Sequence, residues 1–380
     1  MTMPYTGGIV FAFEEGTDRQ NCAFPGICVT GDGRWLCSFR AAPRKSAMAG
    51  QHVALTWSDD DGRTWRDPVR PFPPPSVDGK PGSLRTGYIT EREDGSFVAV
   101  LCWVDGSDPT LPFLNEETEG LLDTRTFASR SHDRGETWST VKPIPTDAFP
   151  VPTPITGPLL LLGNGDLACQ FELNKHYDDP APWRHKPVLM FSPDYGRTWP
   201  DHSVASDDPD GHVFFWDQRP AVLPDGRILD FFWTYDTQRA EYLNIHARES
   251  RDDGRSWSPM RDTGVPGQPA APVMLRNGDI AMVYVDRTRA PVISMRTSAD
   301  GGLTWPPSTE LAIYQSVDRS QNVDKRDMND AWSEMSKFSI GLPATATLPN
   351  GDVLVVFYAG DDADRTSIRW AQVQASPRHA

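Results

Sequence analysis

Three acidic residues stand at places from which carboxylate chemistry could be performed. Asp217 lies in the segment FFWDQRPAVLPDG, Glu172 ends the apolar run of CQFELNKHYDD, and Asp236 ends that of FFWTYDTQR. Two carboxyl groups on either side of a glycosidic bond can hydrolyse it, and their separation decides between inversion and retention. The sequence therefore predicts that Asp217, Glu172 and Asp236 supply the carboxyl pair of a glycosidase, and Asp236 opposite Glu172 would form such a pair.

The same segments hold side chains suited to a second kind of reaction. His176 and Tyr177 follow one of the acids, Tyr235 precedes another, and Arg219 lies two residues after the third. An arginine that neutralises the carboxylate of a uronic acid acidifies the neighbouring C–H, and a histidine or tyrosine can then take the proton. A lyase that uses His176, Tyr177 or Tyr235 together with Arg219 is the alternative to a hydrolase.

Arginines recur in the loops around these acids. A forked guanidinium binds a carboxylate through two parallel hydrogen bonds, so converging arginines would select an acidic sugar, whereas scattered ones would only add surface charge. Arg239 could bind such a group or simply pair with Glu241, and Arg289 belongs to the same set. The predicted substrate-binding residues are Arg19, Arg40, Arg85, Tyr177, Arg219, Arg239 and Arg287.

Six hairpins must position these side chains. In each, a turn with glycine separates two apolar runs, and Asp-Gly or Asn-Gly at such a place is a strong hairpin signal because both residues tolerate positive φ. The copies are CVTGDGRWLCSF, ITEREDGSFVAVLCW, LLLGNGDLACQF, VLPDGRILDFFW, MLRNGDIAMVYV and TLPNGDVLVVFY.

A second repeat alternates with the hairpins and reads S-x-D-x-G-x-(T/S)-W. Its five copies are SDDDGRTW, SHDRGETW, SPDYGRTW, SRDDGRSW and SADGGLTW. They resemble the Asp-box of the sialidase superfamily, and the resemblance covers nearly the whole chain. The aspartate of such a box can accept backbone N–H groups across a tight turn, and the glycine supplies a left-handed position. We therefore expect Asp60, Asp133, Asp194, Asp252 and Asp300 to build turns rather than to catalyse.

The order hairpin, third strand, Asp-box, fourth strand makes one four-stranded antiparallel unit, the blade of a propeller. Six hairpins predict an all-β, six-bladed β-propeller that occupies residues 1–380 as a single domain. The last unit lacks its outer strand, which IVFAFEE (9–15) should supply by pairing the N-terminus with the last blade. A short helix is expected in RDMNDAWSEMSKF. Long loops gather on the face opposite the Asp-boxes, so we expect the site there.

The resemblance also implies where this chain departs from true sialidases. In that family an arginine of a Phe/Tyr-Arg-Ile-Pro motif holds the substrate carboxylate, and the matching position here is Ala23, before Phe24 and Pro25. The family's acid/base aspartate would fall near Gln51 or His52, whereas Arg40 does resemble a common arginine position. The sequence predicts a member of the superfamily without true sialidase activity.

Composition excludes several other functions. The net charge of −15 argues against nucleic-acid binding and against adhesion to anionic membranes. The N-terminal segment lacks the features of a signal peptide, so we expect a cytoplasmic protein. Five cysteines without a CxxC pair indicate reduced thiols, and no metal or other cofactor is predicted. The acidic residues Asp105, Asp108, Glu116, Glu117 and Glu119 fit a solvated lid better than a calcium site.

The leading hypothesis is an exo-acting glycoside hydrolase for a short oligosaccharide, acidic if the arginines converge. The alternatives are the lyase and a non-catalytic, carbohydrate-binding propeller. A binding module would keep aromatic and amide groups over the axis without converging carboxylates. The partner in all three cases is a small sugar ligand, and the sequence leaves the oligomeric state open.

Overall fold

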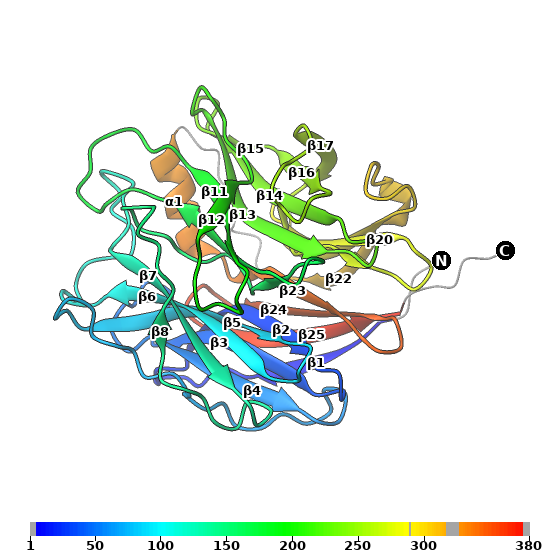
Figure 1. Cartoon of the computed structure of the whole chain (residues 1–380), viewed down its shortest axis with the longest axis horizontal. Coiled ribbons are helices and arrows are strands. Elements are labelled where there is room, and N and C mark those ends of the chain that lie inside the picture. Colours follow the sequence, from blue (N-terminus) through cyan, green and yellow to red (C-terminus); the bar gives the residue numbers. More distant parts are fainter. Residues whose placement is uncertain (1–4, 289, 317–326, 375–380) are drawn as a thin grey trace.

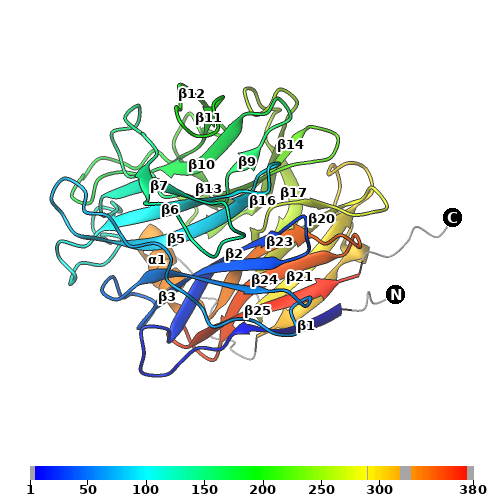
Figure 2. The ribbon, with the colours of Figure 1, turned by 60° about the horizontal axis from the view of Figure 1, so that its bottom comes forward.

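The computed structural model describes residues 5–288, 290–316 and 327–374. Apart from two short helices, their regular secondary structure consists of β-strands, which hydrogen-bond into five sheets. The sheets fan around a common centre, as Figures 1 and 2 show from two directions. The prediction of an all-β propeller is confirmed.

The largest sheet contains seven strands from the two ends of the chain. Its strands are β1 (Tyr5–Phe11), β2 (Asn21–Val29), β3 (Trp35–Ala42), β4 (His52–Ser58), β23 (Ile340–Thr347), β24 (Val353–Gly360) and β25 (Thr366–Val373). Antiparallel β1 lies along β25, from Tyr5 opposite Val373 to Phe11 opposite Ile368. The predicted closure by an N-terminal strand is confirmed, with the strand beginning earlier than expected.

Four smaller sheets complete the ring. One contains β5 (Gly82–Glu91), β6 (Phe97–Asp105), β7 (Thr124–Ser131) and β8 (Lys142–Pro143), and the next contains β9 (Leu160–Leu161), β10 (Leu167–Leu173), β11 (Lys186–Ser192) and β12 (Asp201–Val204). The third consists of β13 (Val213–Val222), β14 (Ile228–Asp236), β15 (Glu241–Tyr242), β16 (Asn244–Ser250) and β17 (Arg261–Pro266). The fourth consists of β18 (Gln268–Pro269), β19 (Val273–Met274), β20 (Ile280–Asp286), β21 (Val292–Ser298) and β22 (Leu311–Gln315).

Six separate four-stranded blades were predicted, and this count is wrong in detail because the described strands form five sheets. The first and last hairpins share one sheet through a parallel bridge between Asn21 and Thr366. The Asn21 amide donates to the Thr366 hydroxyl at 3.0 Å, and that hydroxyl donates to the Cys22 carbonyl at 2.7 Å. Side-chain hydrogen bonds thus fuse the two ends of the chain.

Within the described part of the chain, two helices interrupt the strands. Residues Pro307–Thr309 form a 3-10 turn, and α1 spans Met328–Lys337. The side chain of Asp327 caps α1 by accepting the N–H of Asp330 at 3.1 Å, and Met328 and Ala331 pack onto aromatic residues of β13 and β14. The predicted short helix is confirmed. Neither helix is long and apolar enough to cross a membrane.

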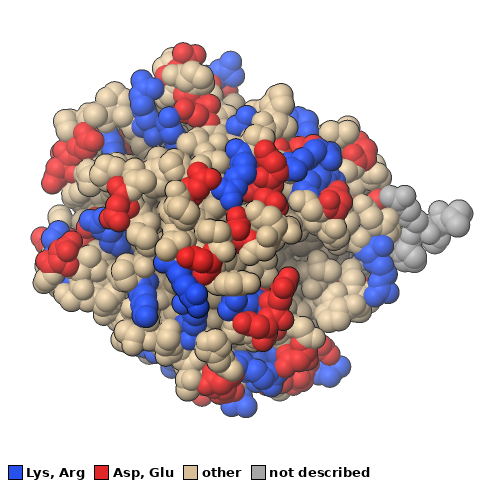
Figure 3. Space-filling model, viewed as in Figure 1, with Lys and Arg blue, Asp and Glu red and all other residues tan. Residues whose placement is uncertain are grey.

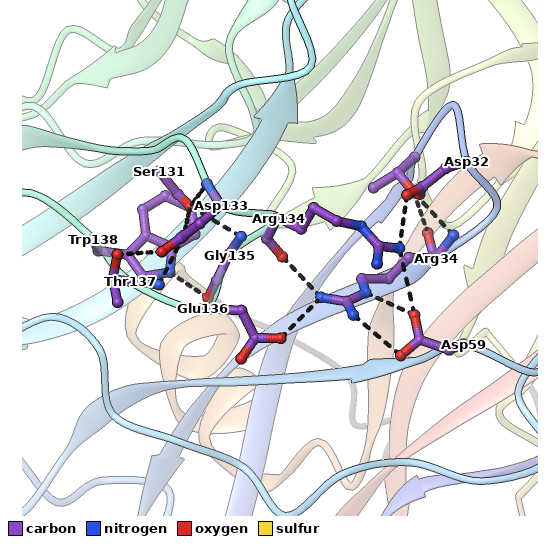
Figure 4. A network of polar contacts seen from close by, with 11 residues as sticks. Asp32, Arg34, Asp59, Ser131, Asp133, Arg134, Gly135, Glu136, Thr137 and Trp138 are labelled. Carbon is purple, nitrogen blue, oxygen red and sulfur yellow. Dashed lines mark hydrogen bonds and ion pairs between the residues drawn. The ribbon is translucent and has the colours of Figure 1, made fainter.

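The S-x-D-x-G repeats build turns, as predicted. In the copy drawn in Figure 4, the Ser131 hydroxyl donates to Asp133, and Asp133 accepts the N–H of Thr137 at 2.9 Å. Gly135 has a φ of 87° and donates its N–H to the Ser131 hydroxyl. All five repeat aspartates accept a backbone N–H four residues on. The backbone and hydroxyl donors of Thr64 lower the pKa of Asp60 to about 2.

The turns also join neighbouring sheets. The Arg134 guanidinium lies 2.7 Å from the Asp32 carboxylate in the first hairpin, while Arg34 donates to the Arg134 carbonyl at 2.9 Å (Figure 4). Arg34 in turn donates to Asp59 at 2.8 Å. Acidic and basic side chains alternate over the face seen in Figure 3, without a large patch of one sign.

Candidate functional site

Bulges in the innermost strands shape the centre of the propeller. The pairing register shifts in β2 between Ala23 and Gly26, in β5 between Leu84 and Thr86, in β13 between Trp216 and Arg219, and in β23 between Gly341 and Ala344. A bulge re-aims the side chain of its extra residue. The residues at these bulges are Phe24, Arg85, Asp217 and Leu342, and three of them have a positive φ: 52° at Phe24, 49° at Asp217 and 45° at Leu342.

Residues beside these bulges line one cavity. Gly26 of β2, Tyr88 of β5, Arg219 of β13 and Ala344 of β23 all border it, and its volume is about 70 Å³. Elements from distant parts of the chain therefore meet at one point. Of the four bulge residues, Leu342 itself lines the cavity, and residues near the other three bulges border it.

Asp217 is the accessible acid of this centre. Its side chain is 27% exposed, and the Arg219 guanidinium lies 3.4 Å from one of its carboxylate oxygens. The amide of Gln268 donates to the other oxygen. These contacts orient the carboxylate, and its left-handed backbone presents it from the bulge.

Glu172 lies against the backbone of Asp217. One oxygen of its carboxylate accepts the Asp217 N–H, and the other lies 3.3 Å from Nε2 of His185. The Glu172 side chain is only 11% exposed, and the His185 side chain is buried between Trp183 and Phe214. Glu172 thus fixes the backbone of Asp217, a role that the sequence did not predict.

Four basic residues gather near the centre. Arg40 is fully buried and donates to three neutral acceptors, the side chains of Gln51 and Asn21 and the carbonyl of Ala47. Arg287 is buried and donates to the Ile340 carbonyl at 2.8 Å and to the Gln268 amide oxygen at 3.0 Å. Arg40 and Arg287, both predicted to bind substrate, therefore use their donors within the protein.

The other two members of the cluster are Lys45 and Arg85. Burial lowers the pKa of the Lys45 amine well below its usual value, and the charges of Arg287, Arg40 and Arg85 lower it further. Burial also lowers the pKa of Arg85 to about 10. Because these cations act on one another, positive charge is concentrated at the centre of a strongly acidic protein.

Two tyrosines stand among these charges. Burial raises the pKa of Tyr88 to about 12, and the charges of Arg219, Asp217 and Arg85 all act on this phenol. Burial also raises the pKa of Tyr358, whose phenol is hydrogen-bonded to Arg287 and feels the charge of Asp217. Both phenols therefore keep their protons near neutral pH.

Other predicted residues lie away from this centre. Tyr235 is fully buried, stacks on Trp216 with ring centroids 5.2 Å apart, and donates its hydroxyl to the Asp327 carbonyl. Asp236 accepts the N–H groups of Gln238 and Arg239 and caps a turn. The predicted pairing of Asp236 with Glu172 is therefore not found among the contacts of the described residues.

The remaining predicted residues occupy loops. Arg239 is 69% exposed and lies 3.5 Å from both Asp236 and Glu241, so the simple ion pair is what the structure shows. His176 is exposed, with its ring bonded to the Pro150 carbonyl at 2.9 Å, and Tyr177 accepts a hydrogen bond from Asn115 through its own carbonyl. Arg19 pairs with Glu14 at 2.7 Å. Arg289 lies outside the described residues.

The acidic side chains of the loop after β6 have separate partners and do not gather into a cation site. Asp105 pairs with Lys80 at 2.9 Å, and Asp108 accepts the N–H and hydroxyl of Thr110. In the described ranges, no three His, Cys, Asp or Glu side chains form a group that could hold a metal. The five cysteines are free thiols, four of them buried.

Five residues of this centre were not among the predicted site residues: His185, Gln268, Lys45, Tyr88 and Tyr358. One of them had a usable signal: Tyr358 comes near the end of the second strand of the sixth hairpin, the position that singled out Glu172 and Asp236 in theirs. Tyr88 and Gln268 lie in innermost strands. There the pattern of apolar residues does not distinguish a core side chain from one that faces the axis.

Residues 100–355 match the family model described as BNR repeat-like domain, which covers more than half of the chain. A search of curated proteins gives no match. Solved structures are similar over nearly the whole length. A Dyadobacter fermentans protein of unknown function has a TM-score of 0.70 at 17% identity, covering 97% of this chain and 99% of its own.

Two enzymes of known activity share the same architecture. The intramolecular trans-sialidase of Ruminococcus gnavus, in complex with oseltamivir carboxylate, has a TM-score of 0.66 at 12% identity, covering 96% of each chain. The α-L-arabinanase of Penicillium chrysogenum, in complex with arabinobiose, has a TM-score of 0.64 at 16% identity, covering 96% of this chain and 97% of its own. At these identities the likeness shows the fold alone.

Proposed function

Because this chain belongs to the family of BNR repeat-like domains, we propose that the charged centre of its propeller is the active site of a glycoside hydrolase. The substrate we propose is a short acidic oligosaccharide, cleaved from its end. One observation carries the proposal: an accessible carboxylate, Asp217, stands on a left-handed bulge beside a concentration of buried positive charge. The glycosidase and trans-sialidase activities of similar folds support a carbohydrate substrate.

The proposed roles follow from access and hydrogen bonding. Asp217 is the carboxylate that faces the sugar and acts as base or nucleophile at the anomeric carbon. Glu172 positions Asp217, since its carboxylate is occupied by the Asp217 N–H and lies beside His185. Tyr88 and Tyr358 are the proposed hydrogen-bond donors to the sugar, because burial raises the pKa of each phenol and keeps its proton in place.

Of the three acids that the sequence predicted to supply a carboxyl pair, Asp217 and Glu172 are the two that lie in contact. A catalytic pair of these two would require Glu172 to leave the Asp217 N–H and approach the sugar. Asp236 is less suited to the second role because its carboxylate closes a turn. The lyase alternative keeps a phenol beside Arg85 and Arg219 in Tyr88, but His176 lies in an exposed loop.

The test is turnover by Asp217→Asn on a panel of short neutral, uronic and sialylated oligosaccharides, read by product mass. We expect the wild type to give fragments whose masses sum to the substrate plus one water. Loss of a catalytic carboxylate should lower turnover by about 100-fold or more. Asp236→Asn is the control, and it should retain near wild-type turnover because an amide oxygen can still accept the turn N–H groups.

Other outcomes would redirect the assignment. Fragments that sum to the substrate mass alone, one with an unsaturated ring, would show β-elimination and favour the lyase. An Asp217→Asn variant with full turnover would overturn the proposed role of this carboxylate. Binding without products from any substrate would favour the carbohydrate-binding propeller.

A further inference from the structure

We infer that Arg85 binds the carboxylate of the acidic sugar and fixes its orientation relative to Asp217. The inference rests on the proposed function for the identity of the sugar. The binding of a carboxylate at Arg85 does not depend on turnover, so the two can be tested separately.

The position of Arg85 comes from the bulge in β5. Its extra residue lies between Leu84 and Thr86, which keep their pairing with β6. The guanidinium carbon lies 4.1 Å from the ring centroid of Phe113 and 5.1 Å from that of Phe24. Phe24 is the residue at the bulge of the neighbouring strand β2, so two bulges bring the cation and one of its rings together.

Arg85, which is half-buried, differs from the buried Arg40 and Arg287 in its partners. Arg40 and Arg287 donate to side-chain and backbone oxygens. By contrast, no hydrogen bond or ion pair joins the Arg85 guanidinium to another side chain or carbonyl in 5–288, 290–316 or 327–374, and it lies against the two aromatic rings. A guanidinium carries five N–H donors in a planar fork. Phenylalanine rings offer no oxygen acceptor to these donors, whereas a carboxylate can engage such a fork through two parallel bonds.

The surrounding charge favours an anion at this place. Burial lowers the pKa of Arg40 well below its usual value, and the positive charge of Arg85 lowers it further. Lys45 is affected by Arg85 in the same way. A carboxylate bound near these cations would offset their mutual repulsion. The side chain of Ala23, which precedes Phe24, has neither a charge nor a hydrogen-bond donor to contribute.

Tyr88, three residues after Arg85 in β5, connects Arg85 with Asp217. The phenol of Tyr88 feels the charges of both, together with that of Arg219. Tyr88 also lines the axial cavity with Arg219. A sugar whose carboxylate binds Arg85 would therefore place its ring near Tyr88 and the carboxylate of Asp217, and the acidic residue would be the one at the site of cleavage.

The experiment is calorimetric titration of the full chain with D-glucuronate, N-acetylneuraminate and D-glucose. We expect the wild type to bind at least one acidic probe more tightly than D-glucose. Arg85→Met should weaken that binding by about 10- to 100-fold, because hydrogen bonds between charged groups are lost. Arg85→Lys should fall between the two, since it keeps the charge but not the fork. D-glucose binding should not change.

Arg92→Met is the matched control. Arg92 follows the other end of β5, and its guanidinium carbon lies 4.8 Å from the ring centroid of Tyr195, so the same kind of cation–ring contact is lost away from the site. Circular dichroism and thermal unfolding check that each variant folds. If Arg85→Met does not fold, the comparison of Arg85→Lys with wild type decides.

Each result separates this inference from the proposed function. Unchanged binding of the acidic probes by a folded Arg85 variant overturns the role of Arg85, even if Asp217→Asn abolishes turnover. Equal wild-type affinity for acidic and neutral probes overturns it as well. Arg85-dependent binding of an acidic probe by a protein without turnover supports the carboxylate site and overturns the hydrolase.

Discussion

Replacement of Glu172 tests whether this residue positions Asp217 or takes part in the reaction. The Asp217 N–H donates to the Glu172 carboxylate, and Asp217 holds a φ of 49°, a conformation that costs a non-glycine residue about 1–2 kcal/mol. In Glu172→Ala this N–H loses its acceptor at a poorly solvated place, which costs about 1–3 kcal/mol. We therefore expect Glu172→Ala to lower the free energy of unfolding by about 2–3 kcal/mol and to lose most of its turnover.

Glu172→Gln separates the two roles. The glutamine carbonyl can still accept the Asp217 N–H, so a positioning role predicts a loss of turnover of less than about tenfold and a loss of stability near 1 kcal/mol. A catalytic carboxylate would instead lose about as much turnover as Asp217→Asn. The assays are urea unfolding and steady-state kinetics on the best substrate of the panel.

Glu91 offers a matched control. Its carboxylate also accepts a backbone N–H, that of Gly31 in the turn between β2 and β3 at 2.7 Å, but at an exposed site. Glu91→Ala and Glu91→Gln should both retain wild-type turnover. If Glu172→Gln loses turnover as Asp217→Asn does while keeping its fold, the positioning role is refuted, and Glu172 belongs to the predicted carboxyl pair.

Two further predictions concern the frame. Hydrogen bonds from Thr137 and Ser131 lower the pKa of Asp133 to about 2, so this carboxylate stabilises the fold above its unfolded pKa near 4, and the contribution is lost as the pH falls through 2. Thermal unfolding from pH 7 to 2 should therefore show a smaller loss for Asp133→Asn than for wild type, with turnover at pH 7 unchanged; an identical pH dependence would contradict this. Deletion of residues 1–11 removes β1 and uncovers the edge of β25. It should therefore lower the melting temperature, measured by calorimetry, and promote association, measured by light scattering. An unchanged melting temperature would show that closure by β1 is dispensable.

The fold was largely predictable because its signals are local. Each hairpin needs a glycine turn between apolar runs, and each repeat aspartate accepts the N–H four residues on, so both patterns lie within short windows of sequence. The number of sheets was not predictable in this way. It depends on Asn21 and Thr366, whose side chains meet only when the two ends of the chain come together. That residues 1–380 form a single domain stays a prediction.

The candidate site was predictable only where an acid or a base stood beside a strand end. Asp217, Arg219 and Arg85 were chosen on that ground, and the structure brings them to one centre. The same ground also selected Tyr235 and Asp236, which the structure places in an aromatic core and in a turn. At the end of a strand, a shift of one residue along the backbone decides whether a side chain points into the core, into a turn or toward the propeller axis. The sequence pattern does not reveal this shift.

Bulges explain why the sequence pattern does not reveal this one-residue shift. In regular strands, side chains alternate between two faces, so hydrophobic alternation reports which face is buried. Phe24, Arg85 and Asp217 each occupy a bulge, where the alternation slips and an additional side chain is re-aimed. Glu172 holds one of these bulges through the Asp217 N–H. The geometry of the centre therefore depends on hydrogen bonds that fix irregular backbone, and loss of the acceptor in Glu172→Ala should displace Asp217 although Glu172 acts only through the Asp217 backbone.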